Sequence, residues 1–206
     1  MFDEVELWDV AAVMQVASMA GRHWNWRPFR LLPTAERPGL IATRSQLRLE
    51  ATHGLADGPE PEILFVPGGY GARLAAKNAA ITDWCARIWP RLSLALTLGT
   101  GAAVLGAAGV LGDAEVAAGA ENREWLAGEF PGARWTEGSG VVRSSSGKLL
   151  SVASGAHSLE LGLALVESCL GARLARTLRT NLGLAEAATR IDIGPLPLEA
   201  PGRRQG

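Results

Sequence analysis

The stretch that decides the fold class is residues 92–111, LSLALTLGTGAAVLGAAGVL. Residues 92–98 form an almost continuous apolar run, which is typical of a strand buried on both faces of a parallel sheet. The turn Gly99-Thr100-Gly101 follows, and the small apolar residues after it predict a helix over 100–109. A buried strand that turns sharply into a helix is the elbow on which α/β enzymes hold a nucleophile.

The same alternation of strands and helices continues on both sides of this elbow. Buried strands are predicted at 62–67 (EILFVP) and 149–153 (LLSVA). Helices are predicted over four segments, which are residues 9–20, 80–89, 157–170 and 171–182. Because strands alternate with helices within one domain, the pattern predicts an α/β fold with a mainly parallel sheet.

Composition and charge exclude several classes of protein. The 206 residues carry a net charge of −1, so we expect neither a nucleic-acid nor a membrane-surface partner. Two cysteines and three widely separated histidines predict no disulfide scaffold, no metal centre and no cofactor. The start, MFDEVELWD, lacks the features of a signal peptide, so we expect a cytoplasmic protein. Abundant Arg, Ala, Gly and Leu indicate a GC-rich bacterial source.

Four segments together resemble the ThiJ/PfpI family, whose fold is that of class I glutamine amidotransferases, and most closely its isonitrile-hydratase-like branch. They are FDEVELWDVAAVMQVASMAG (2–21), ILFVPGGYGARL (63–74), LTLGTGAAVLGAAGVLGDAEV (96–116) and SVASGAHSLELGLALVESCLG (151–171). The resemblance implies a flavodoxin-like three-layer α/β domain over residues 1–188, in a protein that forms a homodimer. Residues 189–206, which are rich in Pro, Gly and Arg, are expected to form a disordered tail.

The resemblance also implies positions for catalytic groups, and two of them hold glycine. The family's catalytic cysteine falls on Gly99, and the histidine that follows the elbow helix falls at about Gly119. The acidic partner of the cysteine falls on Glu6 and is kept. Glycine supplies neither a thiolate nor a base, so the elbow cannot perform nucleophilic catalysis in the family's way. Because glycine tolerates a positive φ, Gly99 still permits the sharp turn.

We therefore expect a non-catalytic relative whose vestigial elbow pocket binds a small polar ligand. The candidate binding residues are Glu6, Gly68, Gly69, Gly99 and Thr100. Gly68 and Gly69 are expected to offer backbone N–H groups to an anion, and Thr100 to contribute its backbone N–H. The alternative is an active hydrolase or hydratase, of isonitrile hydratase, amidase or glyoxalase type, that uses an unidentified nucleophile.

Other reactive or aromatic residues are expected to be structural. Cys85 and Cys169 are predicted to be packed thiols, and His157 a solvent-exposed histidine at a helix end. Three tryptophans near the acidic loop are expected to serve core or subunit packing, with an aromatic ligand wall as the alternative. They are Trp8, Trp24 and Trp26. A sensor half of a transcription regulator is disfavoured, because few residues follow the domain.

The N-terminus departs from the family pattern. Family members begin with an apolar strand immediately before the acidic loop, whereas this chain begins inside that loop. The strand would lie centrally in the sheet, so its loss would expose backbone groups and apolar faces of both neighbours. We expect a misassigned start codon or a shortened chain; the alternative is a natural sheet without that strand.

Overall fold

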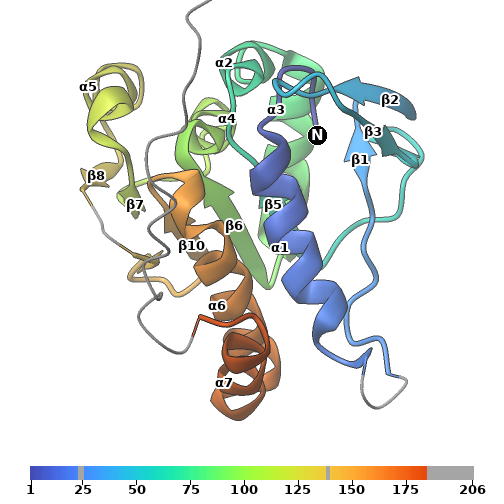
Figure 1. Cartoon of the computed structure of the whole chain (residues 1–206). Coiled ribbons are helices and arrows are strands. Elements are labelled where there is room, and N and C mark those ends of the chain that lie inside the picture. Colours follow the sequence, from blue (N-terminus) through green and yellow to red (C-terminus); the bar gives the residue numbers. More distant parts are fainter. Residues whose placement is uncertain (23–25, 138–139, 185–206) are drawn as a thin grey trace, which may run out of the picture.

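The computed structural model describes residues 1–22, 26–137 and 140–184 (Figure 1). Its centre is a four-stranded sheet with the order β5-β6-β10-β9. These strands are β5 (Ile63–Val66), β6 (Leu94–Leu98), β10 (Leu149–Val152) and β9 (Val142–Arg143). β5, β6 and β10 are parallel, and β9 is antiparallel to β10. The expected tail, residues 189–206, lies outside the described residues.

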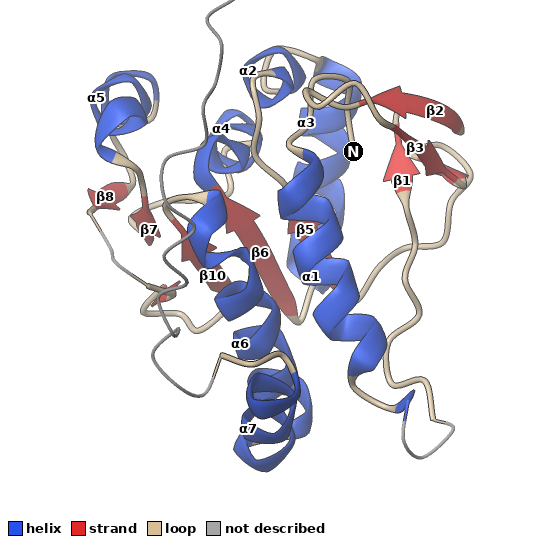
Figure 2. Ribbon diagram, in the orientation of Figure 1, coloured by secondary structure: helices blue, strands red, loops and turns tan. Residues whose placement is uncertain are grey.

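Helices cover both faces of this sheet (Figure 2). They are α1 (Leu7–Met19) and α6 (Ser158–Leu170) on one face, and α3 (Ala79–Ile88) and α4 (Ala102–Ala107) on the other. Alternate residues of β5 join the two cores: Phe65 packs with the α1–α6 side, and Leu64 with the α3–α4 side. Every residue of β6 is buried, as a strand covered on both faces should be. The predicted three-layer α/β fold is confirmed.

Smaller elements surround these layers. The helices are α2 (Gly71–Ala75), α5 (Ala120–Glu129) and α7 (Ala172–Asn181). The strands are β1 (Thr34–Ala35), β2 (Gly39–Ala42), β3 (Arg48–Ala51), β4 (His53–Gly54), β7 (Glu115–Ala117) and β8 (Arg134–Thr136). β2 and β3 form an antiparallel hairpin, while β1 pairs with β4, and β7 with β8, in parallel.

Short 3-10 turns also lie among the described residues, including η2 (Trp89–Arg91), η3 (Gly99–Gly101) and η4 (Gly155–His157). η3 is where the structure departs from the helix predicted over 100–109. The chain makes a 3-10 turn directly after β6, and the α-helix α4 begins only at Ala102 and ends at Ala107. The predicted helix over 9–20 begins earlier than expected, at Leu7, so Glu6 is its N-cap residue.

β5 has no strand partner on one side within the described part of the chain, since it pairs only with β6. Beyond that open edge lies a cavity of about 820 Å³, whose far wall includes residues 28–36. This is the place in the sheet where an additional strand would lie. Among the residues described, no helix has both the length and the apolar character needed to cross a membrane.

Candidate functional site

The elbow predicted from the sequence is present at the carboxyl end of β6. Gly99 forms the tip of this elbow. The φ angle of Gly99 is +50°, in the left-handed region that residues other than glycine rarely adopt. The turn η3 then leads into α4, whose residues Ala102 to Leu105 are buried. The backbone therefore keeps the geometry of a nucleophile elbow, although its tip carries no side chain.

Gly119 lies close to the same main-chain oxygen as Gly99. It follows β7 and is the N-cap residue of α5, with an ordinary φ of −67°. A Cβ added at Gly99 and a Cβ added at Gly119 would each lie 3.4 Å from the main-chain oxygen of Ala153. The chain thus brings together the two positions at which the resemblance places a cysteine and a histidine, and both are glycine.

The loop at Gly68 and Gly69 does not offer the free N–H groups expected from the sequence. The N–H of Gly68 donates to Asp9 Oδ2 at 3.0 Å, and the N–H of Gly69 donates to Thr100 Oγ1 at 3.1 Å. The Thr100 hydroxyl in turn donates to the oxygen of Gly69 at 2.8 Å. Both N–H groups are already hydrogen-bonded within the protein, so this loop does not offer them to an anion.

Glu6 stands at the entrance of α1, next to this loop. Its backbone N–H donates to the oxygen of Gly68 at 3.1 Å, and the residue is half-buried. Within the ranges that the structure describes, no hydrogen bond to the Glu6 carboxylate is present, and it does not cap α1. Its negative charge is close enough to Asp9 to raise the pKa of that residue.

Asp9 is a site residue that the sequence reasoning missed. Its side chain is 2% exposed, and besides the bond from Gly68 it faces the Ser158 hydroxyl at 3.4 Å. Burial, and to a smaller extent the charge of Glu6, raises the pKa of Asp9 to about 6, against the opposing effect of the two hydrogen bonds. The signal in the sequence is an acidic residue one turn before Val13 on the buried face of α1.

Trp8 and His157 lie at the turn η4. Trp8 Nε1 donates to the oxygen of Gly155 at 2.9 Å, and His157 Nδ1 lies 3.4 Å from Ser154 Oγ. His157 is half-buried rather than fully exposed. Trp8 is 54% exposed and Trp26 is 51% exposed, so neither packs in the core of the chain. Subunit packing, the other part of the expectation, stays a prediction. Trp24 lies outside the described residues.

Arg73, on α2, is a cation near the elbow that was also missed. Its guanidinium stacks on the ring of Trp125, 3.8 Å from the centroid, and donates to Asn122 Oδ1 at 2.9 Å. Trp125 and Asn122 belong to α5, so Arg73 ties α2 to α5, and both helices contact η3. In the sequence, Arg73 stands just after the Gly-Gly-Tyr-Gly loop, and this position could have indicated that Arg73 lies near the elbow.

The two cysteines are not at the elbow. Cys85 is buried in α3, and Cys169 is exposed near the end of α6. Both line the cavity next to β5. Burial raises the pKa of Cys85 to about 11 and raises the pKa of Cys169, so both thiols are protonated near neutral pH. Among the described residues, no group of three or more His, Cys, Asp or Glu is placed to hold a metal ion.

Comparisons with known proteins agree on the fold. No protein-family model matches the chain, and no curated protein sequence matches it. A ThiJ/PfpI family protein from Pseudomonas syringae is similar in structure, with a TM-score of 0.80 and 21% identity, over 95% of this chain and 76% of that one. A DJ-1 superfamily protein from Salmonella typhimurium has a TM-score of 0.72 and 20% identity, over 88% and 94% of the two chains.

A third similar structure belongs to a transcriptional regulator. It is an AraC family transcriptional regulator from Pseudomonas putida, with a TM-score of 0.72 and 26% identity, over 88% of this chain and 95% of that one. The class defined by these comparisons is an α/β protein with the flavodoxin-like fold of ThiJ/PfpI and DJ-1 superfamily proteins. The resemblance noted in the sequence is therefore confirmed at the level of the fold.

Proposed function

We propose that this chain is a non-catalytic protein of the ThiJ/PfpI fold whose elbow binds a small polar ligand. The observation that carries the proposal is the convergence of Gly99 and Gly119 on the oxygen of Ala153. A reactive side chain at the first position and a base at the second would both begin close to this oxygen. With two glycines neither side chain is present, while the strand and the turn that lead into α4 are kept.

The chemistry of the surrounding groups favours a ligand that donates hydrogen bonds. Ala153 contributes the carbonyl oxygen that both glycines face, and we propose that the carboxylate of Glu6, at the N-cap of α1, turns toward it. The N–H groups of Gly68 and Gly69 are already used by Asp9 and Thr100. We therefore propose a neutral or cationic ligand with N–H or O–H groups, such as a small amide, in place of the anion first expected.

A role in binding rather than catalysis is compatible with one of the similar structures. The fold occurs in an AraC family transcriptional regulator, at 26% identity. A transcriptional regulator acts by binding, so this fold is compatible with a binding role. We also propose that the protein is a cytoplasmic homodimer, which light scattering on the purified chain tests by a mass of two copies.

The alternative is an active hydrolase or hydratase with a nucleophile placed elsewhere. The raised pKa of Cys85 favours the binding role, because the thiolate is the reactive form. Both cysteines line the cavity next to β5. Thr100 is also a poor nucleophile, since its hydroxyl is engaged with both the N–H and the oxygen of Gly69.

Acetamide and acetate make a matched pair of probes for this proposal. They have nearly the same shape, but only acetamide donates hydrogen bonds and only acetate is an anion. We expect millimolar acetamide to shift the amide NMR signals of Gly99, Thr100 and Gly119, and acetate to leave them unchanged. Gly119→Val should abolish the shifts by filling the space, whereas Gly128→Val, in open surroundings on α5, should retain them. Shifts with acetate alone, or with neither probe, contradict the proposal.

A further inference from the structure

Trp8 presents a half-exposed indole that the protein holds in one orientation. It lies in the first turn of α1 and is 54% exposed, and its Nε1 donates to the oxygen of Gly155 in η4 at 2.9 Å. α1 packs against α6, which directly follows η4 (Figure 1). Because the ring is already oriented, a ligand that covers it loses little conformational entropy. Trp8 is therefore suited to binding.

Other aromatic rings of the chain are covered by its own cations. The pairs are Arg44 on Tyr70, Arg73 on Trp125 and Lys148 on Trp89, with 5.6, 3.8 and 5.2 Å between the guanidinium carbon or ammonium nitrogen and the ring centre. The face of an aromatic ring attracts a cation, and tryptophan attracts it most strongly. Within the ranges that the structure describes, no cation of the chain lies over Trp8, so its exposed surface is open to a cation from outside.

Two carboxylates accompany Trp8 without a counter-charge. A Cβ at Gly155 would lie 3.5 Å from Trp8 Cδ1 and 3.1 Å from Asp9 Oδ1, so the ring and this carboxylate meet at Gly155. Glu6 is the N-cap residue of the same helix, and its charge acts on Asp9. In the part of the chain that the structure describes, neither carboxylate forms an ion pair. This corner of the molecule therefore carries negative charge that the described residues do not neutralise.

The N-terminus of α1 supplies only part of the missing positive charge. A helix dipole is equivalent to about half an elementary charge at that end. Above pH 7, Asp9, whose pKa is about 6, adds its negative charge to that of Glu6. Burying an anion without a counter-charge costs free energy, and a bound cation reduces this cost. The electrostatics at Trp8 therefore favour a cationic ligand over a neutral one.

Trp8 is close enough to the elbow for one small molecule to contact both. Ala153, whose oxygen lies near Gly99 and Gly119, precedes Gly155 by two residues. Two residues of chain span at most about 7 Å. Since Gly155 accepts the hydrogen bond from Trp8, the indole and the oxygen of Ala153 belong to the same small region.

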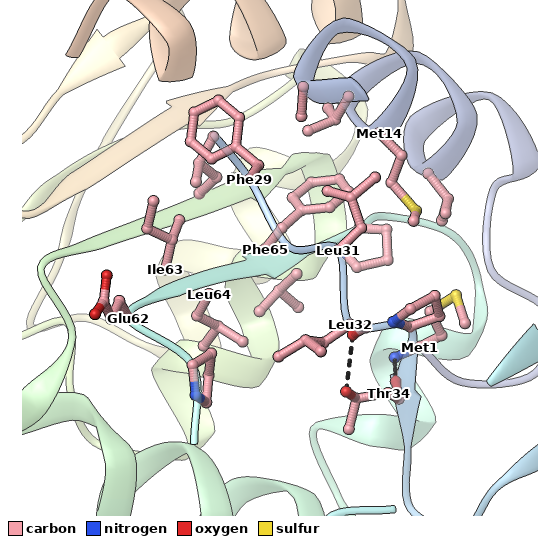
Figure 3. Close-up of a pocket in the computed structure, with 18 of the residues that line it drawn as sticks. Met1, Met14, Phe29, Leu31, Leu32, Thr34, Glu62, Ile63, Leu64 and Phe65 are labelled. Carbon is pink, nitrogen blue, oxygen red and sulfur yellow. Dashed lines mark hydrogen bonds between the residues drawn. The ribbon is translucent and has the colours of Figure 1, made fainter. Parts of the chain in front are cut away.

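The cavity next to β5 is a separate space that does not suit a cation. Apolar side chains surround it, among them Phe29, Ile63 and Phe65, and its volume is about 820 Å³ (Figure 3). The nitrogen of Met1 stands at its edge and donates a hydrogen bond to the oxygen of Thr34 (Figure 3). Burial lowers the pKa of this ammonium group from 8.0 to about 6, so a positive charge is already unfavourable there.

We propose that Trp8 and Glu6 form a cation subsite beside the elbow, and that the ligand is a small amine, amidine or guanidine. Its positive group rests on the indole of Trp8 and pairs with the carboxylate of Glu6, while its N–H groups donate to the oxygen of Ala153. This inference rests on the proposed function, since it names the chemical class of the ligand at the same site.

Acetamidinium tests the charge, because it is the cationic counterpart of acetamide and has nearly the same shape. NMR titration follows the indole N–H of Trp8 and the amides of Gly99, Thr100 and Gly119. Acetamidinium should shift all four signals and should bind at least about tenfold more tightly than acetamide. Equal affinities would overturn the cation subsite, and acetamide shifts at the elbow would then leave the proposed function standing. Shifts with neither probe would contradict both.

A set of variants assigns the gain in affinity to the aromatic face. Trp8→Leu keeps an apolar side chain without a ring, and it should reduce acetamidinium binding to roughly the level of acetamide. Trp8→Phe keeps a ring and should retain most of the gain. Trp26→Leu removes another exposed indole, 51% exposed and beyond the other end of α1, and should change nothing. Equal affinities for Trp8→Leu and Trp26→Leu would contradict a role for Trp8.

Glu6→Gln tests the second half of the subsite. It should weaken acetamidinium binding several-fold and leave acetamide binding unchanged, because only the cation pairs with the carboxylate. An equal effect on both probes would overturn the pairing with Glu6.

A second copy packed on Trp8 is the competing occupant. Hydroxyl-radical footprinting read by mass spectrometry distinguishes the two. We expect Trp8 to be oxidised as readily as Trp26 in the free protein and to be protected by acetamidinium. Protection of Trp8 without any probe would show that another copy of the chain covers it, and would overturn the proposal.

Discussion

Gly99 and Gly119 face the same atom, the main-chain oxygen of Ala153, and a Cβ at either position would lie 3.4 Å from it. The two glycines are 20 residues apart in the sequence and come from different elements, a strand-to-helix elbow and the N-cap of α5. Both are positions at which the resemblance places a reactive side chain, and in this chain both come close to one oxygen atom. The two positions can also be compared directly, because an added Cβ makes the same contact at each, whereas φ is +50° at Gly99 and −67° at Gly119.

Gly99→Ala should lower the free energy of unfolding by about 1 to 2 kcal/mol, because Gly99 has φ +50° and a Cβ is strained there. The matched control is Gly119→Ala, which adds a Cβ at the same 3.4 Å from Ala153 O but at φ −67°. Urea denaturation measures both. Equal losses for the two variants would show that the contact, and not backbone strain, sets the cost.

Gly99→Cys together with Gly119→His should place a thiol and an imidazole in the vacated space. The expected result is a thiol that titrates below about 8.5, the ordinary value, and measurable turnover of methylglyoxal or an isonitrile. Gly99→Ala with Gly119→His is the control, since it has the same backbone strain and no thiol. A thiol pKa at or above the ordinary value, without turnover, would mean that the elbow no longer supports a nucleophile.

Asp9 should make the protein less stable as the pH rises. Its pKa in the folded chain is about 6, above the unfolded value of 3.8, so folding favours the protonated form. Below the unfolded pKa the group costs nothing, and the cost grows as the pH passes through 6. Two pKa units correspond to at most about 3 kcal/mol. Asp9→Asn can still accept the hydrogen bond from Gly68, and it should remove this dependence of stability on pH.

Measurements of Tm from pH 4 to pH 8 check the prediction for Asp9. The difference in Tm between Asp9→Asn and the unmodified chain should increase from pH 4 to slightly above pH 6 and then level off. A difference that is constant, or that shrinks with rising pH, would mean that Asp9 does not retain its proton in the folded chain.

Glu6→Gln should lower the pKa of Asp9, because the negative charge of Glu6 is one of the two causes that raise it. Carbon-detected NMR of the Asp9 carboxyl group as a function of pH gives the midpoint of its titration, which is its pKa. Glu124→Gln, on α5, is a control that removes an equal charge. An unchanged midpoint in Glu6→Gln would mean that Glu6 points away from the loop at Gly68, and it would remove Glu6 from the proposed site.

Acetylation of Met1 should stabilise the protein more at pH 6 than at pH 8.5. The folded pKa of the ammonium group is about 6, below its ordinary value of 8.0, so folding favours the neutral amine. Stability is therefore complete above the ordinary pKa and is lost as the pH falls toward 6. The acetylated nitrogen can still donate to Thr34, and the charge is gone. A gain in Tm that is independent of pH would argue against a buried ammonium.

Much of the fold could be predicted from the sequence, because buried strands and amphipathic helices have strong local patterns. β5, β6, β10, α1, α3, α6 and α7 all lie where the apolar runs indicate. α5 could not be predicted in this way, since it is polar around most of its surface and only Leu126 is buried. β7 and β8 have three residues each, which is too short to show the alternation of buried and exposed side chains that identifies a strand.

The candidate site was predicted less completely than the fold. The glycine at the elbow tip could be placed from its local motif, whereas Glu6 was placed by the resemblance and its role in a site stays a prediction. Asp9 could not, because its burial depends on Gly68 and Ser158, which are distant in sequence. The use of the Gly69 N–H by Thr100 also depends on how two loops meet. Hydrogen bonds between loops are set by tertiary structure, and a single sequence does not display them.

The measurement that tests the central claim most directly is turnover by the purified, unmodified chain on an isonitrile, methylglyoxal and a simple amide. The account predicts no product above the buffer blank, because the space between Gly99 and Gly119 holds neither a nucleophile nor a base. Product formation that persists after Cys85→Ser and Cys169→Ser would contradict it and would require a nucleophile elsewhere. Product formation lost with one cysteine would contradict it too, and would place the chemistry at that thiol.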